Sequence, residues 1–272
     1  MKGLIGIKEF AVIIGEILKT DRWQFIACSG DMGEGKSCLT SQLSEEIALN
    51  TNTPFTYNDN LTFLRKELKV WVDGDEKGEK QKPEYSAVLA DELISMFFKR
   101  NWFNDDQIGG IELLNKCRDR HLAVLGNIPN FWDLDSAIYP IVSLWIHIHE
   151  RGRAWVFQKD RNPFAVDKWH KRENEKRFKR DGHPTKCIGF LTEVYFEDWT
   201  PQKKIEYYEV RNTKRKNTEG QGKKQSKNVT RVLKQRDTLI KYVSKENHIS
   251  QVYISKMIDL PQPLISKILE DT

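Results

Sequence analysis

Residues 30–37 read Gly30-Asp31-Met32-Gly33-Glu34-Gly35-Lys36-Ser37 and fit the pattern G-x-x-x-x-G-K-[ST] without a mismatch. The glycines let the backbone curl, so that its N–H groups can surround phosphate oxygens. The lysine can reach the β- and γ-phosphates, and the serine hydroxyl can ligate Mg²⁺. At an average glycine usage of ~7%, this pattern arises by chance in roughly one chain per hundred of this length. The stretch therefore predicts a loop that binds a nucleotide.

The sequence on either side of this loop supplies the elements that it needs. Residues 23–28 form a short apolar run typical of a buried strand, and a helical pattern runs from Lys36 to about residue 49. A helix that begins there would point the positive end of its dipole at the phosphates. We expect ATP to contact the loop and the first turn of this helix, at Gly30, Asp31, Met32, Gly33, Glu34, Gly35, Lys36, Ser37 and Cys38.

A pair of carboxylates ends a second predicted strand. Residues 86–90 are followed directly by Asp91 and Glu92, about 55 residues after the phosphate loop. In P-loop NTPases a carboxylate at this place holds Mg²⁺ through its water shell, which suits Asp91 acting together with Ser37. Glu92 is suited to activate the attacking water. The sequence has no Asn-Lys-x-Asp tetrapeptide for guanine recognition, which favours ATP over GTP.

Asn127 follows a third apolar run, residues 121–126. In a parallel sheet this run would end beside the strand of Asp91, where Asn127 would contact the γ-phosphate or the attacking water. An ordinary loop asparagine explains the residue about as well. Phosphoryl transfer also gains from an arginine that a neighbouring subunit often supplies. Arg118 and Arg120, just before this run, are slightly favoured for that role over the other candidates, Arg100, Arg151 and Arg153.

The composition fits one medium domain and one small domain. The chain has 272 residues, of which 39% are hydrophobic and 11% aromatic, which argues against a disordered protein. Apolar runs alternate with helical patterns, which predicts an α/β fold, a largely parallel sheet with helices on both faces. We expect this ATPase domain to span residues 1–200, a basic linker to span residues 201–228, and a small all-α domain to span residues 229–272.

The net charge of +5 is unevenly distributed. Residues 201–236 contain 12 Lys/Arg and 3 Asp/Glu, a local balance of +9, so that the rest of the chain sums to −4. A basic block on a near-neutral body favours a polyanionic partner, most simply nucleic acid. A solvated linker that keeps the protein soluble is the simpler alternative. Within the block we expect Lys223 and Lys224 to contact DNA.

Residues 249–269 read as a short helix, a turn near Asp259 and a second helix. This segment resembles the helix-turn-helix of bacterial and phage regulators. The resemblance places Gln262, Ser266 and Lys267 on or near the recognition helix, which enters the major groove. A helical hairpin for oligomerisation is the alternative, and the neighbouring basic block favours DNA.

Several classes of protein are disfavoured. No apolar stretch approaches the ~20 residues that a membrane span needs, and no secretory signal is recognisable. His147 and His149 alternate on a predicted strand and share a face, but no third ligand is apparent, so we interpret them as ordinary strand residues. A reducing compartment, and hence the cytoplasm (of the host, for a virus), is indicated by four scattered cysteines, Cys28, Cys38, Cys117 and Cys187.

Over residues 25–157 the order of these features resembles the FtsK–HerA branch of the additional-strand P-loop ATPases, which includes viral genome-packaging, conjugation and Zot-like phage assembly ATPases. The resemblance rests on the phosphate loop, the Asp91-Glu92 pair and residues 117–121 before a strand. Where the branch usually has Thr-Gln, this chain has Gly126-Asn127. The resemblance implies a RecA-like P-loop NTPase sheet with helices on both faces. It also implies a ring-forming ATPase that moves DNA, with arginines reaching a neighbour's ATP. RecA-like and terminase-like relatives fit nearly as well.

These features together predict a Mg²⁺-dependent ATPase that translocates or packages double-stranded DNA as a homo-oligomer, in a virus or mobile element. Two alternatives stay open. One is an ATP-dependent DNA-binding switch or loader for replication or transcription. The other is a Zot-like assembly or secretion ATPase that acts on protein, for which the basic block would be incidental.

Overall fold

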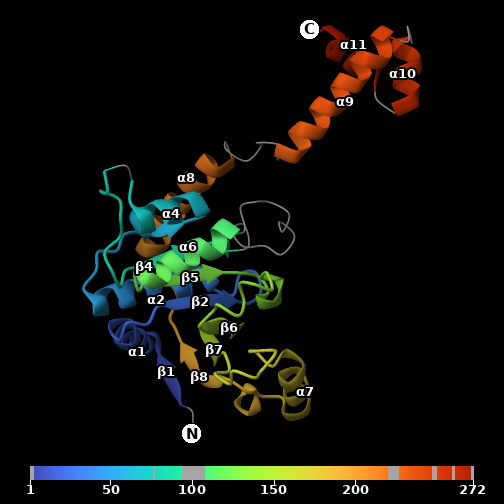
Figure 1. The fold of residues 1–272 in the computed structure, drawn as a ribbon. Coiled ribbons are helices and arrows are strands. Elements are labelled where there is room, and N and C mark those ends of the chain that lie inside the picture. The colour runs from blue at the N-terminus through green and yellow to red at the C-terminus, as the bar shows by residue number, and fades with distance from the viewer. Residues whose placement is uncertain are drawn as a thin grey trace. The chain divides into compact units, whose positions relative to one another are not determined.

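The computed structural model describes residues 3–75, 77–93, 108–219, 227–246, 250–258 and 261–270 (Figure 1). The chain divides into two compact units, Met1–Thr218 and Glu219–Thr272. The first unit contains the phosphate loop and a β-sheet, and the second consists of α-helices in its described part.

Within the described residues, eight strands form one sheet in the order β1-β8-β7-β6-β2-β5-β4-β3. The strands β2 to β6 are parallel, with β5 between β2 and β4, so their carboxyl ends lie at one edge of the sheet. β7 is antiparallel to β6 and β8. The strands are β1 Leu4–Gly6, β2 Gln24–Ser29, β3 Leu61–Thr62, β4 Ala87–Ala90, β5 Ala123–Asn127, β6 Leu144–Glu150, β7 Arg153–Gln158 and β8 Phe190–Tyr195.

Helices cover both faces of this sheet because the central strands are apolar on both sides. Ile26 and Cys28 of β2 belong to a core shared with α1 (Ile7–Lys19), α2 (Lys36–Thr51) and α8 (Pro201–Glu219). Phe25 and Ala27 belong to a second core, shared with α4 (Arg65–Asp73), α6 (Ile108–Asp119) and the short η2 (Phe131–Asp133). The predicted α/β fold, a mostly parallel sheet with flanking helices that is typical of a P-loop NTPase, is confirmed.

Several elements differ from the sequence expectation. The apolar spacing of residues 3–18 predicts a helix, but residues 4–6 form the edge strand β1, which pairs with the distant β8. Residues 53–57 fit a strand in sequence, but Tyr57 begins the short helix α3 (Tyr57–Asn60), and the strand that follows, β3, has only two residues. Residues 201–219, expected to begin a linker, form α8, which packs on the first unit through the completely buried Tyr207.

The chain between β7 and β8 does not close as a tight hairpin. It forms a loop, α7 (Lys171–Asp181) and the short η3 (Pro184–Lys186) before it returns to the sheet (Figure 1). No residue of α7 is buried. The charged composition of residues 168–180 predicts an exposed segment, and the structure shows that this segment is helical from Lys171 onward.

The second unit contains α9 (Lys227–Glu246), α10 (Gln251–Ile258) and α11 (Gln262–Glu270). Its small core is made by Ile240, Ile254, Ile265 and Ile268, one or two from each helix. These helices lie where the helical pattern of the sequence places them. Among the described residues of the whole chain, no helix is long and apolar enough to span a membrane.

Candidate nucleotide site

The phosphate loop joins β2 to α2 in a conformation that requires glycine. Gly30, Gly33 and Gly35 have φ of 152°, 91° and 98°, values that residues with a side chain rarely adopt. A Cβ on Gly30 would lie 2.9 Å from the backbone oxygen of Ile148 in β6. Gly35 caps α2 in the left-handed region, and the helix begins at Lys36. The loop thus passes close to β6, and its backbone leads into the N-terminal end of α2.

Lys36 lies folded over this loop. Its Nζ donates to the backbone oxygens of Gly30 and Asp31, at 2.7 Å each. Both contacts are to neutral carbonyls, which a phosphate oxygen can replace with a stronger, charge-assisted hydrogen bond. The side chain therefore lies where it can bind a phosphate held in the loop.

Asp91 is the buried centre of the polar side chains at this edge of the sheet, with only 2% of its surface exposed. Its Oδ1 accepts hydrogen bonds from Ser37 Oγ at 3.2 Å and from Asn127 Nδ2 at 2.7 Å. Asn127 Oδ1 in turn accepts from Thr40 Oγ1 at 3.1 Å. The structure thus brings Ser37, Asp91 and Asn127 together, as parallel strands that end side by side predicted.

Helix α8 contributes residues that the sequence analysis did not single out. Tyr207 donates its hydroxyl to Asp91 Oδ2 at 2.7 Å, and Arg211 Nε lies 3.1 Å from the same oxygen. One turn further along, Arg215 forms an ion pair with Glu92. The three side chains lie four residues apart, hence on one helical face. That spacing was readable from the sequence, but the charge of the segment suggested a linker.

The environment fixes the protonation of Tyr207. Burial raises the pKa of its phenol well above the usual value of 10, and the charge of Asp91 adds to the shift. The hydroxyl therefore remains a donor to the carboxylate at every physiological pH. Asp91 thus has donors on both of its oxygens.

Glu92 differs from Asp91 in being accessible. Its side chain is 46% exposed, and its backbone has φ of 77°. A non-glycine residue in the left-handed region costs about 1–3 kcal/mol, and such strain is found preferentially at functional sites. The conformation turns the chain directly after Asp91, so that the two adjacent carboxylates have different surroundings.

The residues at this edge fit a Mg²⁺ ion that is held together with a nucleotide. Ser37 Oγ and Asp91 Oδ1 are two oxygens at 3.2 Å, and Mg²⁺ takes few protein ligands because waters and phosphates complete its octahedron. Within the described part of the chain, no three His, Cys, Asp or Glu side chains gather into a metal site of their own.

His147, Ser29 and Trp145 form a polar row beside the loop. Ser29 Oγ lies 3.0 Å from His147 Nδ1 and accepts from Trp145 Nε1 at 2.7 Å. Burial lowers the pKa of His147, and the nearby His149 lowers it further, so the ring is neutral at pH 7. Burial also raises the pKa of Cys28 to about 12, so its thiol is not ionised.

The two arginines favoured for phosphoryl transfer, Arg118 and Arg120, lie far from this chain's own phosphate loop. Arg118 ends in an exposed pair with Asp119, and Arg120 donates to the backbone oxygen of Lys82 at 2.6 Å. Both precede β5, whose five residues span about 16 Å, so they lie at the opposite edge of the sheet from Asn127. They therefore do not contact a nucleotide held in this chain's own phosphate loop.

The other predicted residues lie elsewhere. Arg151 pairs with Asp198, and Arg153 with Glu150. In the second unit Gln262 and Lys267 are exposed on α11, while Ser266 Oγ donates to Gln251 Oε1 of α10 at 2.7 Å. Outside the described residues lie Arg100, Lys223 and Lys224.

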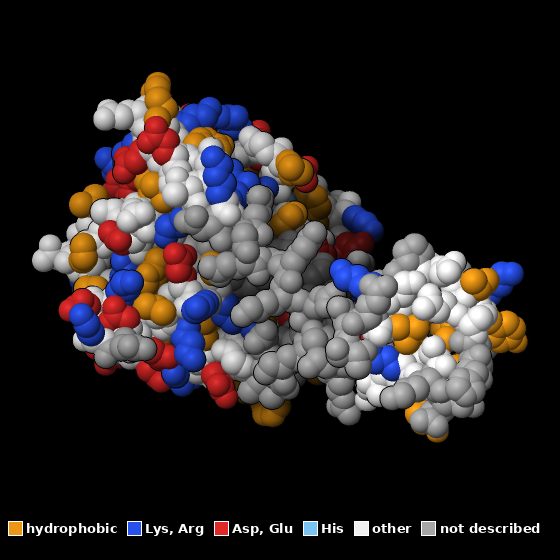
Figure 2. Space-filling model, turned by 90° about the horizontal axis from the view of Figure 1, so that it is seen from above, with side chains coloured by type: hydrophobic (Ala, Val, Ile, Leu, Met, Phe, Trp, Pro, Cys, Tyr) orange, Lys and Arg blue, Asp and Glu red, His pale blue; other side chains and the backbone are white. Residues whose placement is uncertain are grey.

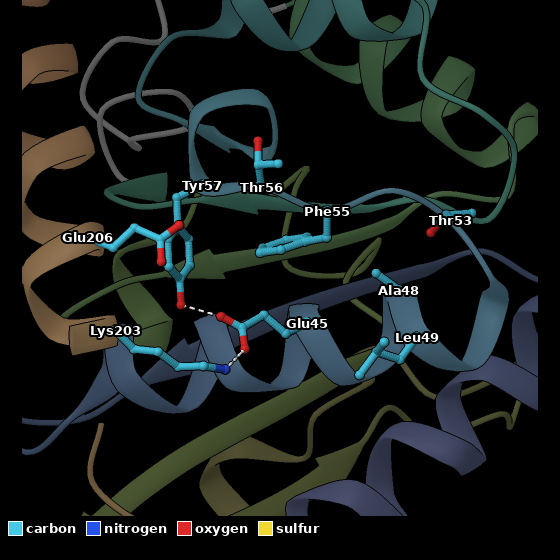
Figure 3. A pocket seen from close by; sticks show the side chains of 9 residues that line it. All are labelled: Glu45, Ala48, Leu49, Thr53, Phe55, Thr56, Tyr57, Lys203 and Glu206. Atoms are coloured by element: carbon cyan, nitrogen blue, oxygen red, sulfur yellow. Dashed lines mark hydrogen bonds and ion pairs between the residues drawn. The ribbon is translucent and has the colours of Figure 1, made fainter. Parts of the chain in front are cut away.

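A separate pocket of about 280 Å³ opens between α2 and α8 (Figure 3). The Tyr57 hydroxyl and the Lys203 ammonium approach the Glu45 carboxylate from two sides. Glu45 is nine positions along α2 from Lys36, about 14 Å, so the pocket is not part of the phosphate site. The Tyr57 ring packs edge-on against Tyr207 at 5.4 Å. The wall of the pocket is thus in contact with a residue that hydrogen-bonds to Asp91.

The sequence matches no known family model, and no functionally curated protein resembles it significantly. Solved structures resemble its fold distantly. A chain of the HORMA:CdnC:Trip13 complex of E. coli MS115-1 is 16% identical, with a TM-score of 0.35, over 51% of this chain and 61% of that chain. This chain therefore spans less than two thirds of that relative.

Two further structures show the same distant likeness. The genome packaging NTPase of Sulfolobus turreted icosahedral virus 2, in complex with ATP-γS, is 12% identical with a TM-score of 0.35, over 50% of this chain and 92% of that chain. AMPPCP-bound DnaA from Aquifex aeolicus is 11% identical with a TM-score of 0.32, over 95% of this chain and 85% of that chain. The chain has a P-loop NTPase fold, and any function must be argued from its own residues.

Proposed function

We propose that this protein is a Mg²⁺-dependent ATPase that uses hydrolysis to translocate or package double-stranded DNA. The observation that carries the ATPase part is the convergence of Ser37, Asp91 and Asn127 beside a glycine loop that ends in Lys36. A hydroxyl, a carboxylate and an amide within hydrogen-bond distance are the groups that phosphoryl transfer requires next to a phosphate loop.

In this proposal each group has one task. The loop N–H groups and Lys36 bind the β- and γ-phosphates, and Ser37 and Asp91 hold Mg²⁺. When bound, the metal ion neutralises charge on the phosphate oxygens. Glu92 orients the attacking water and accepts its proton, since it is the more exposed of the two carboxylates. Asn127 orients the γ-phosphate or the water.

Helix α8 sets a condition on this chemistry. The guanidinium of Arg215 occupies the carboxylate of Glu92, and Oδ2 of Asp91 is shared by Tyr207 and Arg211. Turnover therefore requires Arg215 to leave Glu92. This observation also favours the second candidate, an ATP-dependent DNA-binding switch, because α8 leads directly into the chain of the second unit.

The DNA part of the proposal rests on the helical second unit and the basic segment before it. Gln262, Ser266 and Lys267 of α11 would contact the major groove, and Lys223 and Lys224 the backbone. In a homo-oligomer such as a ring, Arg118 and Arg120 would reach a neighbour's nucleotide, since they are remote from the site of their own chain.

The test is steady-state ATP hydrolysis with and without double-stranded DNA, for the wild type and for Glu92→Gln. Strong stimulation by DNA that the variant abolishes is the result expected of a DNA motor. Turnover that ignores DNA would refute the motor and favour a protein-directed ATPase. Tight ATP binding without turnover, in the presence and absence of DNA, would favour the switch.

A further inference from the structure

The chain between β7 and β8 carries an unusual amount of positive charge. Residues 159–188 contain 10 Lys/Arg and 5 Asp/Glu, a net charge of +5, which equals the net charge of the entire chain. We call this segment the basic excursion. It leaves one antiparallel strand and returns to its direct neighbour, so the sheet itself does not need these residues.

The acidic residues of the basic excursion are already engaged. Each of them has a basic partner or caps a turn of the backbone. The contacts are Asp160–His170, Glu173–Arg177, Glu175–Lys179, Asp181–Arg180, and Asp167 with the N–H groups of Trp169 and Lys171. Each carboxylate thus has a hydrogen-bond or ion-pair partner within the segment, and an approaching anion meets no free one.

Several cations of the same segment remain available, among them Arg161, Arg172 and Lys176. The side chains of these three residues are exposed and have no ion pair or hydrogen bond within the part of the chain that the structure describes. Arg172 and Lys176 lie one turn apart on α7, hence on the same face. The Asp160–His170 contact of 2.6 Å ties the loop that carries Arg161 to the start of this helix. The three cations therefore belong to one surface.

The loop also presents an apolar tip. Phe164 and Val166 are 89% and 103% exposed, yet the loop is closed by a hydrogen bond of 2.7 Å from Asp160 N to the oxygen of Lys168. At its base Trp169 is buried and donates its indole N–H to the oxygen of Tyr139 at 2.8 Å. An ordered loop that exposes apolar side chains gains nothing within the chain and is typical of a contact surface.

The cations of α8 are less available to a polyanion than the composition of residues 201–236 indicates. Four of the cations of α8 form ion pairs with acidic residues of the first unit. They are Lys203 with Glu45, Arg211 with Asp91, Lys214 with Glu67, and Arg215 with Glu92. On the face of the first unit in Figure 2, Lys/Arg and Asp/Glu side chains are interspersed. A polyanion finds unpaired cations on the basic excursion instead.

We propose that the basic excursion is a second DNA-binding surface, located on the ATPase unit, in which Arg161, Arg172 and Lys176 bind backbone phosphates and Phe164 makes an apolar contact with the sugars or bases. A lipid surface fits less well. A helix that lies in a membrane interface needs an apolar face, and α7 has Phe178 as its only aromatic or aliphatic side chain. The inference rests on the proposed DNA-directed function and adds the place where the motor unit itself holds the DNA.

The experiment compares DNA binding by full-length variants. The test variants are Arg172→Glu/Lys176→Glu and Phe164→Asp, and the matched control is Lys8→Glu/Lys19→Glu, two exposed positions on α1 with the same change of charge. Anisotropy of a labelled duplex of arbitrary sequence is measured between about 50 and 200 mM salt. Thermal unfolding of each variant checks that the fold is intact.

We expect the charge-reversed double variant to bind at least about tenfold more weakly at low salt. The slope of log K against log salt should fall by about 1.8, because each phosphate contact contributes about 0.9. Phe164→Asp should weaken binding severalfold, and the control should bind as the wild type does.

Two results would overturn the inference in different ways. If the test and control variants bind duplex equally, the basic excursion is not a DNA-binding surface, and the proposed DNA-directed function is unaffected. No binding of duplex by the wild type would refute both. The same set is tested on phosphatidylserine vesicles, where binding that Phe164→Asp abolishes, with duplex binding unchanged, would assign the surface to a membrane.

Discussion

Replacing Tyr207 by phenylalanine removes one hydroxyl from the interior of the first unit. The ring packs edge-on against Tyr57 at 5.4 Å and lies 4.8 Å from Trp199, and phenylalanine keeps both contacts. What is lost is the hydrogen bond of 2.7 Å to Asp91 Oδ2. The substitution therefore isolates the link between α8 and the acidic centre of the nucleotide site.

The expected loss follows from the surroundings of Asp91. A hydrogen bond to a charged group contributes about 1.5–3 kcal/mol to stability. Because Oδ2 keeps Arg211 at 3.1 Å, we expect a value near the lower end, about 1.5–2 kcal/mol. For a unit of this size each kcal/mol lowers Tm by about 2–4 °C, so Tm should fall by about 3–8 °C.

The assay is thermal unfolding of the full chain, with Tyr208→Phe as the control. Tyr208 is the next residue, is 37% exposed, and lies edge-on to Trp199 at 5.9 Å. Its substitution should leave Tm within about 1 °C, as is usual for surface positions. Because the pKa of Tyr207 is raised, the difference between the two variants should be constant from neutral pH to about pH 9. An unchanged Tm for Tyr207→Phe would show that α8 does not dock through Asp91.

Three further substitutions test the site, with the exposed Lys216→Ala as a common control. Lys36→Ala should lower ATP turnover by about a hundredfold, because it removes a charge aimed at the phosphates, and unchanged turnover would contradict the phosphate role. Arg215→Ala should raise turnover by at most about fivefold, since releasing an exposed ion pair with Glu92 is worth up to about 1 kcal/mol; slower turnover would mean that the pair assists catalysis. His147→Gln should reduce the loss of stability on acidification. Burial lowers the pKa of His147 in the folded state, so the unfolded chain binds a proton at this position first as pH falls through about 6.5, and the folded state is destabilised. Glutamine does not titrate and removes this contribution. Equal pH dependence of Tm in wild type and variant would refute this.

The features that the sequence predicted well are those that depend on local pattern. The phosphate loop needs particular residues at fixed spacing, and its glycines adopt the positive φ values that only glycine adopts readily. Asp91 and Asn127 were placed beside Ser37 by one topological rule, that parallel strands end at the same edge. Local signals and one rule of sheet geometry therefore determine most of the candidate nucleotide site.

The elements that were missed depend on partners distant in sequence. β1 has three residues and exists because Leu4 pairs with Glu193, which lies 189 positions further along the chain. β3 has two residues, held by pairing with β4. Strands this short carry no periodicity of their own, so the sequence pattern gives no signal for them. Their place in the sheet is determined by tertiary pairing.

Helix α8 shows why composition alone misled the expectation for residues 201–219. A high density of lysine and arginine is usual for solvated linkers and for DNA-binding segments, and both interpretations assume that the charges face outward. Here the acidic partners lie on the first unit, where Asp91, Glu92, Glu67 and Glu45 meet cations from one helix. The deficit of positive charge in the rest of the chain was the signal for this pairing. The chain outside residues 201–236 has a net charge of −4. Some cations of residues 201–236 should therefore pair with its carboxylates, and only the remaining cations are available to DNA.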